Sequence, residues 1–266
     1  MKFLSSIICI TTIICSSTSY SWGWNNYGHR VIAEITEQIL QPETKNKIKK
    51  IFGEQFSLRE NSNWAEEIAP QRRRTYKWHY VHVPQDRDEF IADRDCPQGQ
   101  CLISAIENFT QILGQNTASL ESREEALKFL IYLIGELHQP LRCGYREDQG
   151  GQGAKVIYAR KKVSLLKVWD HYLLMKDQMP FETYVDKLTH RYNPKEIKKI
   201  SQGTILDWYL ESRTLLRNHV YTFPLNNVIN FEYQDHAISI IDNQLLKAGI
   251  RLASLLDAIF ADIPPH

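Results

Sequence analysis

Tyr132, Glu136 and Arg142 are the residues whose types and spacing first suggest chemistry. Tyr132 and Glu136 lie one helical turn apart in the stretch EALKFLIYLIGELHQPL, and Arg142 follows just after its proline. Four-residue spacing places two side chains on one face of a helix. A carboxylate on an otherwise apolar face is costly unless a positive group meets it. The partner of Glu136 is therefore either an arginine, which would be structural, or a metal ion, which would be catalytic.

Further residues that could bind a metal are spread along the chain. They are His29 in WNNYGH, Glu66 and Glu67 in NWAEEIA, His79 and His82 in WHYVHVP, and Asp170 and His171 in VWDHYL. Carboxylates and imidazoles are common zinc ligands. Taken singly, however, a histidine is more often a hydrogen-bonded core or surface residue, and an acidic pair on a helix is more often solvated. Spacing alone therefore defines no site.

Helical periodicity dominates the elements that must position these residues. Apolar residues recur at helical spacing over residues 29–40, 101–113, 122–137 and 241–260, with Ser122 in the position of an N-cap. Strand signals are weak outside residues 154–166, which follow a glycine-rich stretch and predict one small hairpin. A chain of 266 residues with 43% hydrophobic residues can bury one substantial core. We expect a single compact all-α domain with a small β-hairpin insertion.

The first 23 residues have the layout of a secretory signal peptide. Lys2 precedes an apolar run from Phe3 to Cys15, and small polar residues follow. The run is too short to remain as a membrane anchor, and no later segment is long and apolar enough to span a bilayer. We expect an exported protein, periplasmic or secreted, whose domain covers residues 24–266.

The predicted cleavage point bears on metal binding. Cleavage after Gly23 would make Trp24 the amino terminus, five residues before His29. A free α-amine has a pKa near neutrality, so it can lose its proton and bind a metal. Cleavage after Ser21 satisfies the preference for small residues equally well.

Export also makes disulfides possible. The stretch CPQGQC is short and turn-forming, so we predict a bridge between Cys96 and Cys101. Cys143 is then left over, either free or paired with another molecule.

The charge balance limits the partners. Lys and Arg number 32 against 31 Asp and Glu, so a diffuse basic field for gripping duplex nucleic acid is absent. Two local basic runs exist, Arg72 to Arg74 and Arg160 to Lys162, and we interpret both as solvated surface.

From Trp24 to about Ala261 the chain resembles the secreted zinc-dependent single-strand nucleases of fungi and plants, types S-one and P-one. These are distantly related to bacterial zinc phospholipase C. The resemblance rests on the order and spacing of WNNYGH, NWAEE, WHYVHVP, CPQGQCLISAIENFT, EALKFLIYLIGELHQPL, GGQGAKV, VWDHYL and AGIRLASLL. It implies an all-α fold with a three-zinc cleft, acting on single-stranded nucleic acid and 3′-nucleotides. We expect a monomer.

The resemblance also implies metal ligands. One zinc would be held by Trp24 and His29, and Glu136 would bridge from it to a second. Glu66 and His79 would complete the second, and both glutamates stand where the family has aspartate. The extra methylene of glutamate shifts its oxygens by about a bond length, which is large beside zinc–oxygen bonds of about 2.0–2.2 Å.

Three expected ligand positions carry other residues. Tyr132 replaces a histidine of the second zinc and is a poorer ligand, because its pKa of about 10 must first be lowered. Of the third set only Asp170 remains, since Arg142 and Leu166 stand at histidine positions. We therefore expect at most two zinc ions.

The resemblance suggests further roles. Glu66 would orient or deprotonate the attacking water. Tyr80 lies where the family has an aromatic that stacks on a base, and His82 replaces an acid that reads the base edge. Arg142 either holds a phosphate oxygen, partly replacing the third cation, or merely pairs with a neighbouring carboxylate in an inactive site.

Three functions are consistent with these features. The first is an exported, metal-dependent phosphodiester hydrolase or single-strand nuclease with an altered metal set. The second is a catalytically impaired relative that binds a nucleotide or a protein. The third is a phosphate-ester hydrolase of the phospholipase C type. The losses among the ligands favour the second function, and the surviving Trp24, His29, His79 and Asp170 favour the first.

Overall fold

The computed structural model describes residues 24–87, 89–190, 192–224 and 226–261. The predicted signal peptide, residues 1–23, lies outside the described residues.

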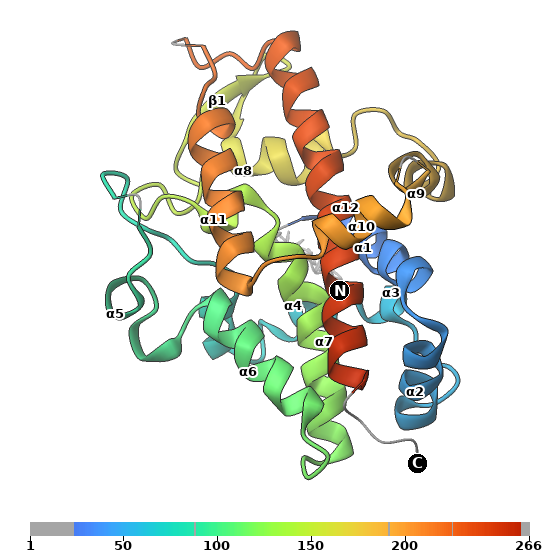
Figure 1. Cartoon of the computed structure of the whole chain (residues 1–266). Helices are drawn as coiled ribbons and strands as arrows, with labels where there is room; N and C mark the ends of the chain where they lie inside the picture. The colour runs from blue at the N-terminus through green and yellow to red at the C-terminus, as the bar shows by residue number, and fades with distance from the viewer. Residues whose placement is uncertain (1–23, 88, 191, 225, 262–266) are drawn as a thin grey trace, which may run out of the picture.

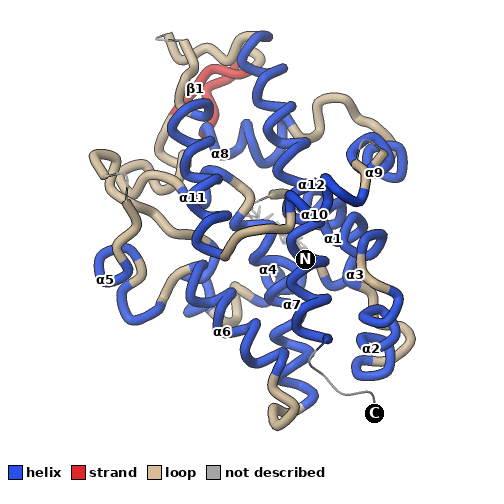
Figure 2. Tube along the Cα trace, in the orientation of Figure 1, coloured by secondary structure: helices blue, strands red, loops and turns tan. Residues whose placement is uncertain are grey.

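The α-helices are α1 (Asn26–Ile39), α2 (Pro42–Phe52), α3 (Leu58–Asn61), α4 (Trp64–Ile68), α5 (Ala92–Asp95), α6 (Leu102–Gly114), α7 (Leu120–Leu137), α8 (Leu165–Lys167), α9 (Phe181–Thr189), α10 (Pro194–Ile200), α11 (Ile205–Leu215) and α12 (Phe231–Ala261). The 3-10 helices are η1 (Arg73–His79), η2 (Pro97–Gly99) and η3 (Pro140–Cys143), and η4 (Val168–Leu173) and η5 (Leu216–Val220) are π-helical. The predicted all-α fold and single compact helical body are confirmed (Figures 1 and 2).

Helix α7 is the centre of the packing. It contacts α1, α4, α6 and α12, and its second half is buried on nearly every side. A helix that is apolar all round must lie inside the fold. The N-cap of the helix is Ser119, whose side chain accepts the Ser122 N–H at 3.1 Å, and the helix stops before Pro140. The predicted N-cap at Ser122 is therefore wrong by three residues, although the helix itself is confirmed.

Helix α12 forms the long spine that packs against α1 and α7 (red in Figure 1). It begins at Phe231, whereas the sequence predicted a start near Ile241. The side chain of Asn230 accepts the N–H of Tyr233 at 2.9 Å and so caps the helix. The first turns are partly exposed and polar, which hid them from a pattern based on apolar spacing.

The predicted hairpin is confirmed as β1 (Lys155–Tyr158) and β2 (Lys161–Ser164), which pair antiparallel. Figure 2 shows it in red at one end of the molecule. The two turn residues, Ala159 and Arg160, have φ values of +47° and +65°. Two left-handed residues in a two-residue loop match the right-handed twist of the strands.

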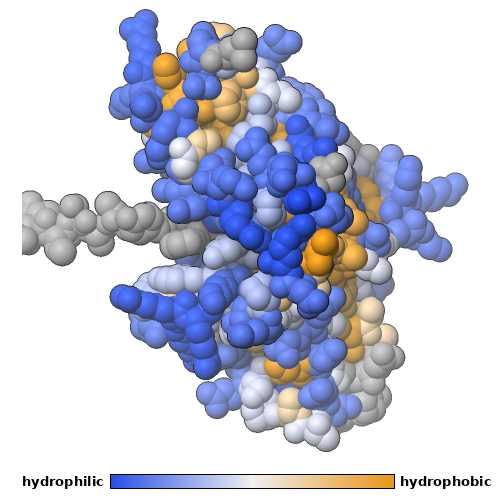
Figure 3. Space-filling view, turned by 90° about the vertical axis from the view of Figure 1, so that its left-hand side faces the viewer, coloured by the Kyte–Doolittle hydropathy of each residue, from blue (hydrophilic) through white to orange (hydrophobic). Residues whose placement is uncertain are grey.

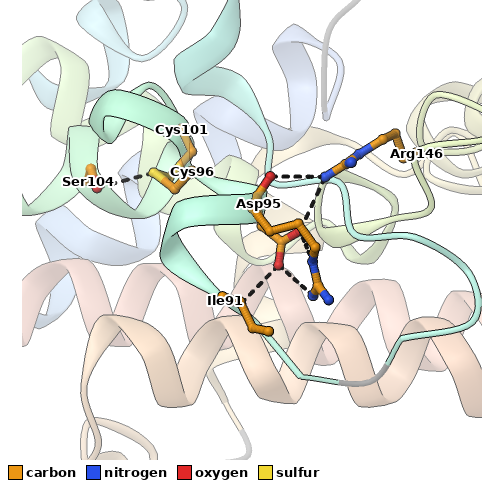
Figure 4. The surroundings of a disulfide bond; sticks show 7 residues. Ile91, Asp95, Cys96, Cys101, Ser104 and Arg146 are labelled. Carbon is orange, nitrogen blue, oxygen red and sulfur yellow. Dashed lines mark hydrogen bonds and ion pairs between the residues drawn. A yellow bond between two sulfur atoms is a disulfide. The ribbon is translucent and has the colours of Figure 1, made fainter.

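The predicted disulfide is also confirmed. Cys96 and Cys101 are bridged, and Cys143 is a free, buried thiol whose pKa is raised by burial. Beside the bridge, Asp95 accepts hydrogen bonds from the Ile91 N–H at 2.9 Å and from Arg146 Nη2 at 3.2 Å (Figure 4). Arg146 follows the segment that carries Arg142, so the disulfide loop is tied to the neighbourhood of the candidate site.

The surface is mostly polar. The face in Figure 3 is covered largely by hydrophilic side chains, with hydrophobic ones near the top, at the height of β1 in Figure 1, and again along the right-hand side of its middle and lower parts. Over the described residues, no helix has the length and apolar character needed to cross a membrane.

Candidate functional site

Helix α1 and the residues before it position Trp24 and His29. Asn25 caps the helix by accepting the Gly28 N–H at 3.1 Å, and its own N–H donates to the Asp170 carbonyl at 3.4 Å. Trp24 is completely buried, and a Cβ at Gly28 would lie 2.8 Å from the Trp24 Cβ. The glycine before His29 therefore allows the start of the domain to fold back beside the segment of Asp170.

Helix α7 presents Tyr132 and Glu136 to His29. Glu136 Oε1 lies 3.3 Å from His29 Nε2, and neither side chain is exposed. The Tyr132 ring stacks on the His29 ring, with centroids 4.1 Å apart and 13° between their planes. A Cβ at Gly135 would lie 2.9 Å from His29 Nδ1, so only glycine allows this close approach.

His79 enters from the end of η1. Its ring lies 5.1 Å from that of Tyr132, centroid to centroid, and the side chain is buried. Burial lowers the pKa of His79 to about 3, and the charges of Arg142 and His29 act in the same direction. Burial likewise lowers the pKa of His29 to about 4, although the negative charge of Glu66 opposes the shift. Both imidazoles are therefore neutral at neutral pH.

The hydrogen bonding of this cluster is incomplete. Within the described part of the chain, both ring nitrogens of His29, both of His79 and both carboxylate oxygens of Glu136 make no hydrogen bond. Buried polar atoms almost always have a partner. Imidazoles and glutamate are among the groups that bind zinc in proteins.

Arg142 is the nearest cation to the acidic groups. Its Nε lies 3.1 Å from Glu136 Oε2, its Nη2 lies 3.9 Å from Asp170 Oδ2, and the side chain is 3% exposed. Burial raises the pKa of Glu136 to about 8, although Arg142 lowers it. Burial likewise raises the pKa of Asp170 against the opposing charge of Arg142. The guanidinium thus favours the charged forms of Glu136 and Asp170, against the effect of burial.

Asp170 lies in η4, where the π-helical turn follows α8. The Gln139 side-chain amide donates to Asp170 Oδ1. Leu166, at one expected histidine position, is nearly buried, and its N–H donates to the Gly151 carbonyl at 3.2 Å. The polar groups beside the Asp170 carboxylate are therefore the Gln139 amide and the Arg142 guanidinium.

Glu66, Tyr80 and His82 lie at the edge of the cluster. Glu66 is half-buried in α4, close enough for its charge to raise the pKa of His29. The Tyr80 and His82 rings stack with centroids 4.3 Å apart. Burial lowers the pKa of His82 to about 3, and the charge of Arg142 contributes.

Across the described residues, no group of three or more His, Cys, Asp and Glu side chains is arranged to hold a metal ion.

Sequence reasoning missed three residues that shape this region. Gln139 orients Asp170, Gly135 makes room for His29, and Asn25 joins the segment before α1 to η4. A signal was available for two of them. Gln139 is a polar residue between a buried helix and a proline, and Gly135 is a glycine in the interior of a helix, which is unfavourable without a packing reason.

The comparisons with known proteins define the class. The chain matches the S1/P1 nuclease family over residues 24–261 and therefore belongs to it, which confirms the resemblance. Its relatives carry the names of nucleases and endonucleases, so the family is one of enzymes that hydrolyse phosphodiester bonds.

Three relatives illustrate the similarity. Endonuclease 4 of Arabidopsis thaliana is 28% identical over 279 residues, which cover 91% of each chain. Nuclease S1 of Aspergillus oryzae is 27% identical, with 95% of this chain and 97% of the relative covered. Nuclease PA3 of a Penicillium species is 30% identical, with 89% and 97% covered. The similarity therefore extends over nearly the whole of each protein.

Proposed function

We propose that this protein is an exported, zinc-dependent hydrolase that cleaves phosphodiester bonds in single-stranded nucleic acid. The observation that carries the proposal is the buried group of His29, His79 and Glu136, whose nitrogens and oxygens make no hydrogen bond among the described residues. The two histidines are neutral because burial lowers their pKa values. Membership of the S1/P1 nuclease family supports the reaction.

We assign the metal-binding residues as follows. Trp24, through its α-amine after cleavage, His29 and Glu136 would hold one zinc ion. Glu66, His79 and Glu136 would hold a second, with Tyr132 beside them. When bound, zinc polarises a phosphate oxygen and increases the acidity of the attacking water.

A third zinc ion does not fit the residues present. Asp170 already accepts from Gln139 and faces Arg142, and Leu166 has no donor atom. Arg142 supplies one positive charge between Glu136 and Asp170, so it balances the negative charge that a third cation would otherwise balance. The expected count is therefore at most two zinc ions.

The remaining residues act on the substrate. Glu66 accepts the proton of the attacking water and orients it, as a general base at the edge of the cluster. Tyr80 offers a ring on which an unpaired base can stack, and His82, stacked on Tyr80, fixes the orientation of that ring. Stacking on a free base face favours single strands, and the near-zero net charge disfavours duplex.

A second candidate function also has an observation in its favour. The Arg142 guanidinium already satisfies much of the charge of Glu136 at 3.1 Å, which is the arrangement expected of a catalytically impaired relative. Such a protein would bind a nucleotide through Tyr80 and hydrolyse nothing.

Zinc analysis and a nuclease assay on the purified mature protein separate the two functions. The proposal expects one or two zinc ions and cleavage of single-stranded DNA or RNA in preference to duplex, with activity lost in Glu66→Gln. Nucleotide binding without zinc and without cleavage would establish the impaired relative instead.

A further inference from the structure

The basic run at Arg72 to Arg74 lies on the segment that carries a proposed metal ligand. Arg73 begins η1, and His79 ends it. A 3-10 helix rises about 2.0 Å per residue, so the whole segment spans about 12 Å. Every cation on η1 therefore lies within about a dozen ångströms of the candidate site along the chain.

The cations of this run differ in their surroundings. Arg72 Nη1 lies 2.6 Å from Glu125 Oε2, so its charge is already balanced. Arg73, Arg74 and Lys77 are exposed, and within the described part of the chain they make no ion pair. We call these three residues the basic ridge.

The position of the basic ridge favours a role in binding over the interpretation of these residues as solvated surface. The chain as a whole is nearly neutral, at +1, so three unbalanced cations within five residues are a local concentration of charge. At physiological ionic strength such charge acts over about 8 Å. The ridge leads through His79 directly to Tyr80, the residue proposed to stack on a base. Because η1 ends at the residue before Tyr80, a strand whose base rests on Tyr80 can place its neighbouring phosphates beside η1.

We propose that the basic ridge binds the phosphates next to the scissile one, and that the preferred substrate is consequently a strand of several nucleotides. This inference rests on the proposed function. Lysine and arginine contacts to phosphates position a strand without reading its sequence. The basic ridge therefore confers a preference for longer substrate strands, with no preference for particular bases.

The test compares short and long substrates in one triple variant, R73A/R74A/K77A. We expect the ratio of kcat/KM for a dodecanucleotide to that for a dinucleotide to fall about tenfold or more. Binding of a hydrolysis-resistant dodecanucleotide should also become less dependent on salt. Each lost phosphate contact on a single strand lowers the slope of log K against log salt by about 0.7, so the slope should fall by about 2.

The matched control is K195A/K198A/K199A, which removes three exposed lysines from α10. It should retain the wild-type length ratio and salt slope, and both variants should keep the wild-type melting temperature. R73E/R74E should lower the length ratio further than the alanine variant.

Each outcome decides a different point. Equal length ratios and salt slopes in the ridge and α10 variants would overturn the inference while leaving the proposed function intact. A wild-type protein that binds the strand without cleaving it would refute hydrolysis, and the salt slopes would still decide the ridge. A wild-type protein that neither binds nor cleaves single strands would refute both.

Discussion

Glu136 is the residue on which the cluster depends, because it lies beside both His29 and Arg142. Glu136→Gln keeps the shape of the side chain and removes the charge that a metal needs. We expect zinc to be lost and any phosphodiesterase activity to fall about 100-fold or more. Glu67→Gln, which changes an exposed acid in α4, should leave both unchanged. Full zinc content and activity in Glu136→Gln would remove this residue from the proposed metal set.

Three replacements explain the predicted shortage of zinc, and they can be reversed together. Tyr132→His, Arg142→His and Leu166→His would supply three imidazoles at positions that now have a phenol, a cation and an alkyl group. We expect elemental analysis to show more zinc per chain, approaching three ions, and phosphodiesterase activity to increase. An unchanged zinc count in the triple variant would mean that these three positions do not face metal sites.

At the residue scale, the sequence predicted which side chains form the cluster. It predicted less well which groups each of them contacts. The four-residue spacing of Tyr132 and Glu136 does place both beside His29. Whether Arg142 pairs with a carboxylate could not be predicted, because the pairing depends on where η3 sets the guanidinium relative to α7. Gln139 was missed for the same reason, since its contact with Asp170 joins residues 31 positions apart.

The contact between α1 and α7 depends on a glycine, and this gives a prediction about elements. In Gly135→Ala the new Cβ would lie 2.9 Å from His29 Nδ1 and 3.1 Å from Ile32 Cδ1, so the imidazole must move. We expect the free energy of unfolding to fall by about 1–3 kcal/mol, despite the helix preference of alanine, and zinc affinity to fall with it. Chemical denaturation and zinc titration measure the two effects.

Gly114→Ala is the control for this prediction. A Cβ at Gly114 would have its nearest contact 3.8 Å away, at Ile259 Cγ2. This variant should retain zinc affinity and wild-type stability or better. If both alanine variants behave alike, the close packing of His29 on α7 is not what holds the imidazole in place.

Asp95, the last residue of α5, should make the stability of the fold depend on pH. Burial alone would raise the pKa of Asp95, but hydrogen bonds from Arg94 and the Ile91 N–H, with the charge of Arg146, lower it below its ordinary value. A lowered pKa stabilises the fold above the unfolded pKa of about 3.9, and the contribution is lost as the pH falls through the folded value. Asp95→Asn should therefore cost about 1.5–3 kcal/mol near neutral pH, and this cost should shrink as the pH falls below about 3.9.

Urea denaturation across this pH range measures the effect of Asp95→Asn. Asp93→Asn, an exposed change in the same helix, should show no such dependence. A stability difference between wild type and Asp95→Asn that stays constant with pH would contradict the role given to the carboxylate.

At the element scale, the sequence predicted the existence of helices far better than their ends. Apolar spacing placed α1, α6, α7 and the last two thirds of α12, and the glycine-rich stretch placed the hairpin. The errors at Ser119 and Asn230 arose because a cap is a local hydrogen bond that apolar periodicity does not report. The π-helical turn at Asp170 leaves no signal in periodicity, since it is one irregular turn between short elements.

For the whole molecule, the proposed function links export to metal binding through Trp24. Trp24 is buried, and the following N–H of Asn25 donates to the carbonyl of Asp170, so the start of the domain lies against the candidate site. We expect amino-terminal sequencing of the exported protein to begin at Trp24, and elemental analysis to find at most two zinc ions per chain. An additional residue before Trp24 would convert the amine into an amide, which cannot release a proton to bind zinc.

A mature protein that retains Gly23 therefore tests the first zinc position by itself. It should lose one zinc ion and keep the ion assigned to Glu66, His79 and Glu136, because that position does not use the amine. The wild-type protein made with the natural terminus is the matched comparison, since the two differ by one residue only. Equal zinc content in both would exclude Trp24 as a ligand, and three zinc ions in the wild type would show that Arg142 and Leu166 do not abolish the third position. If the wild type instead holds no zinc and Glu136→Gln alters nothing, the protein binds nucleotides or a partner without metal chemistry.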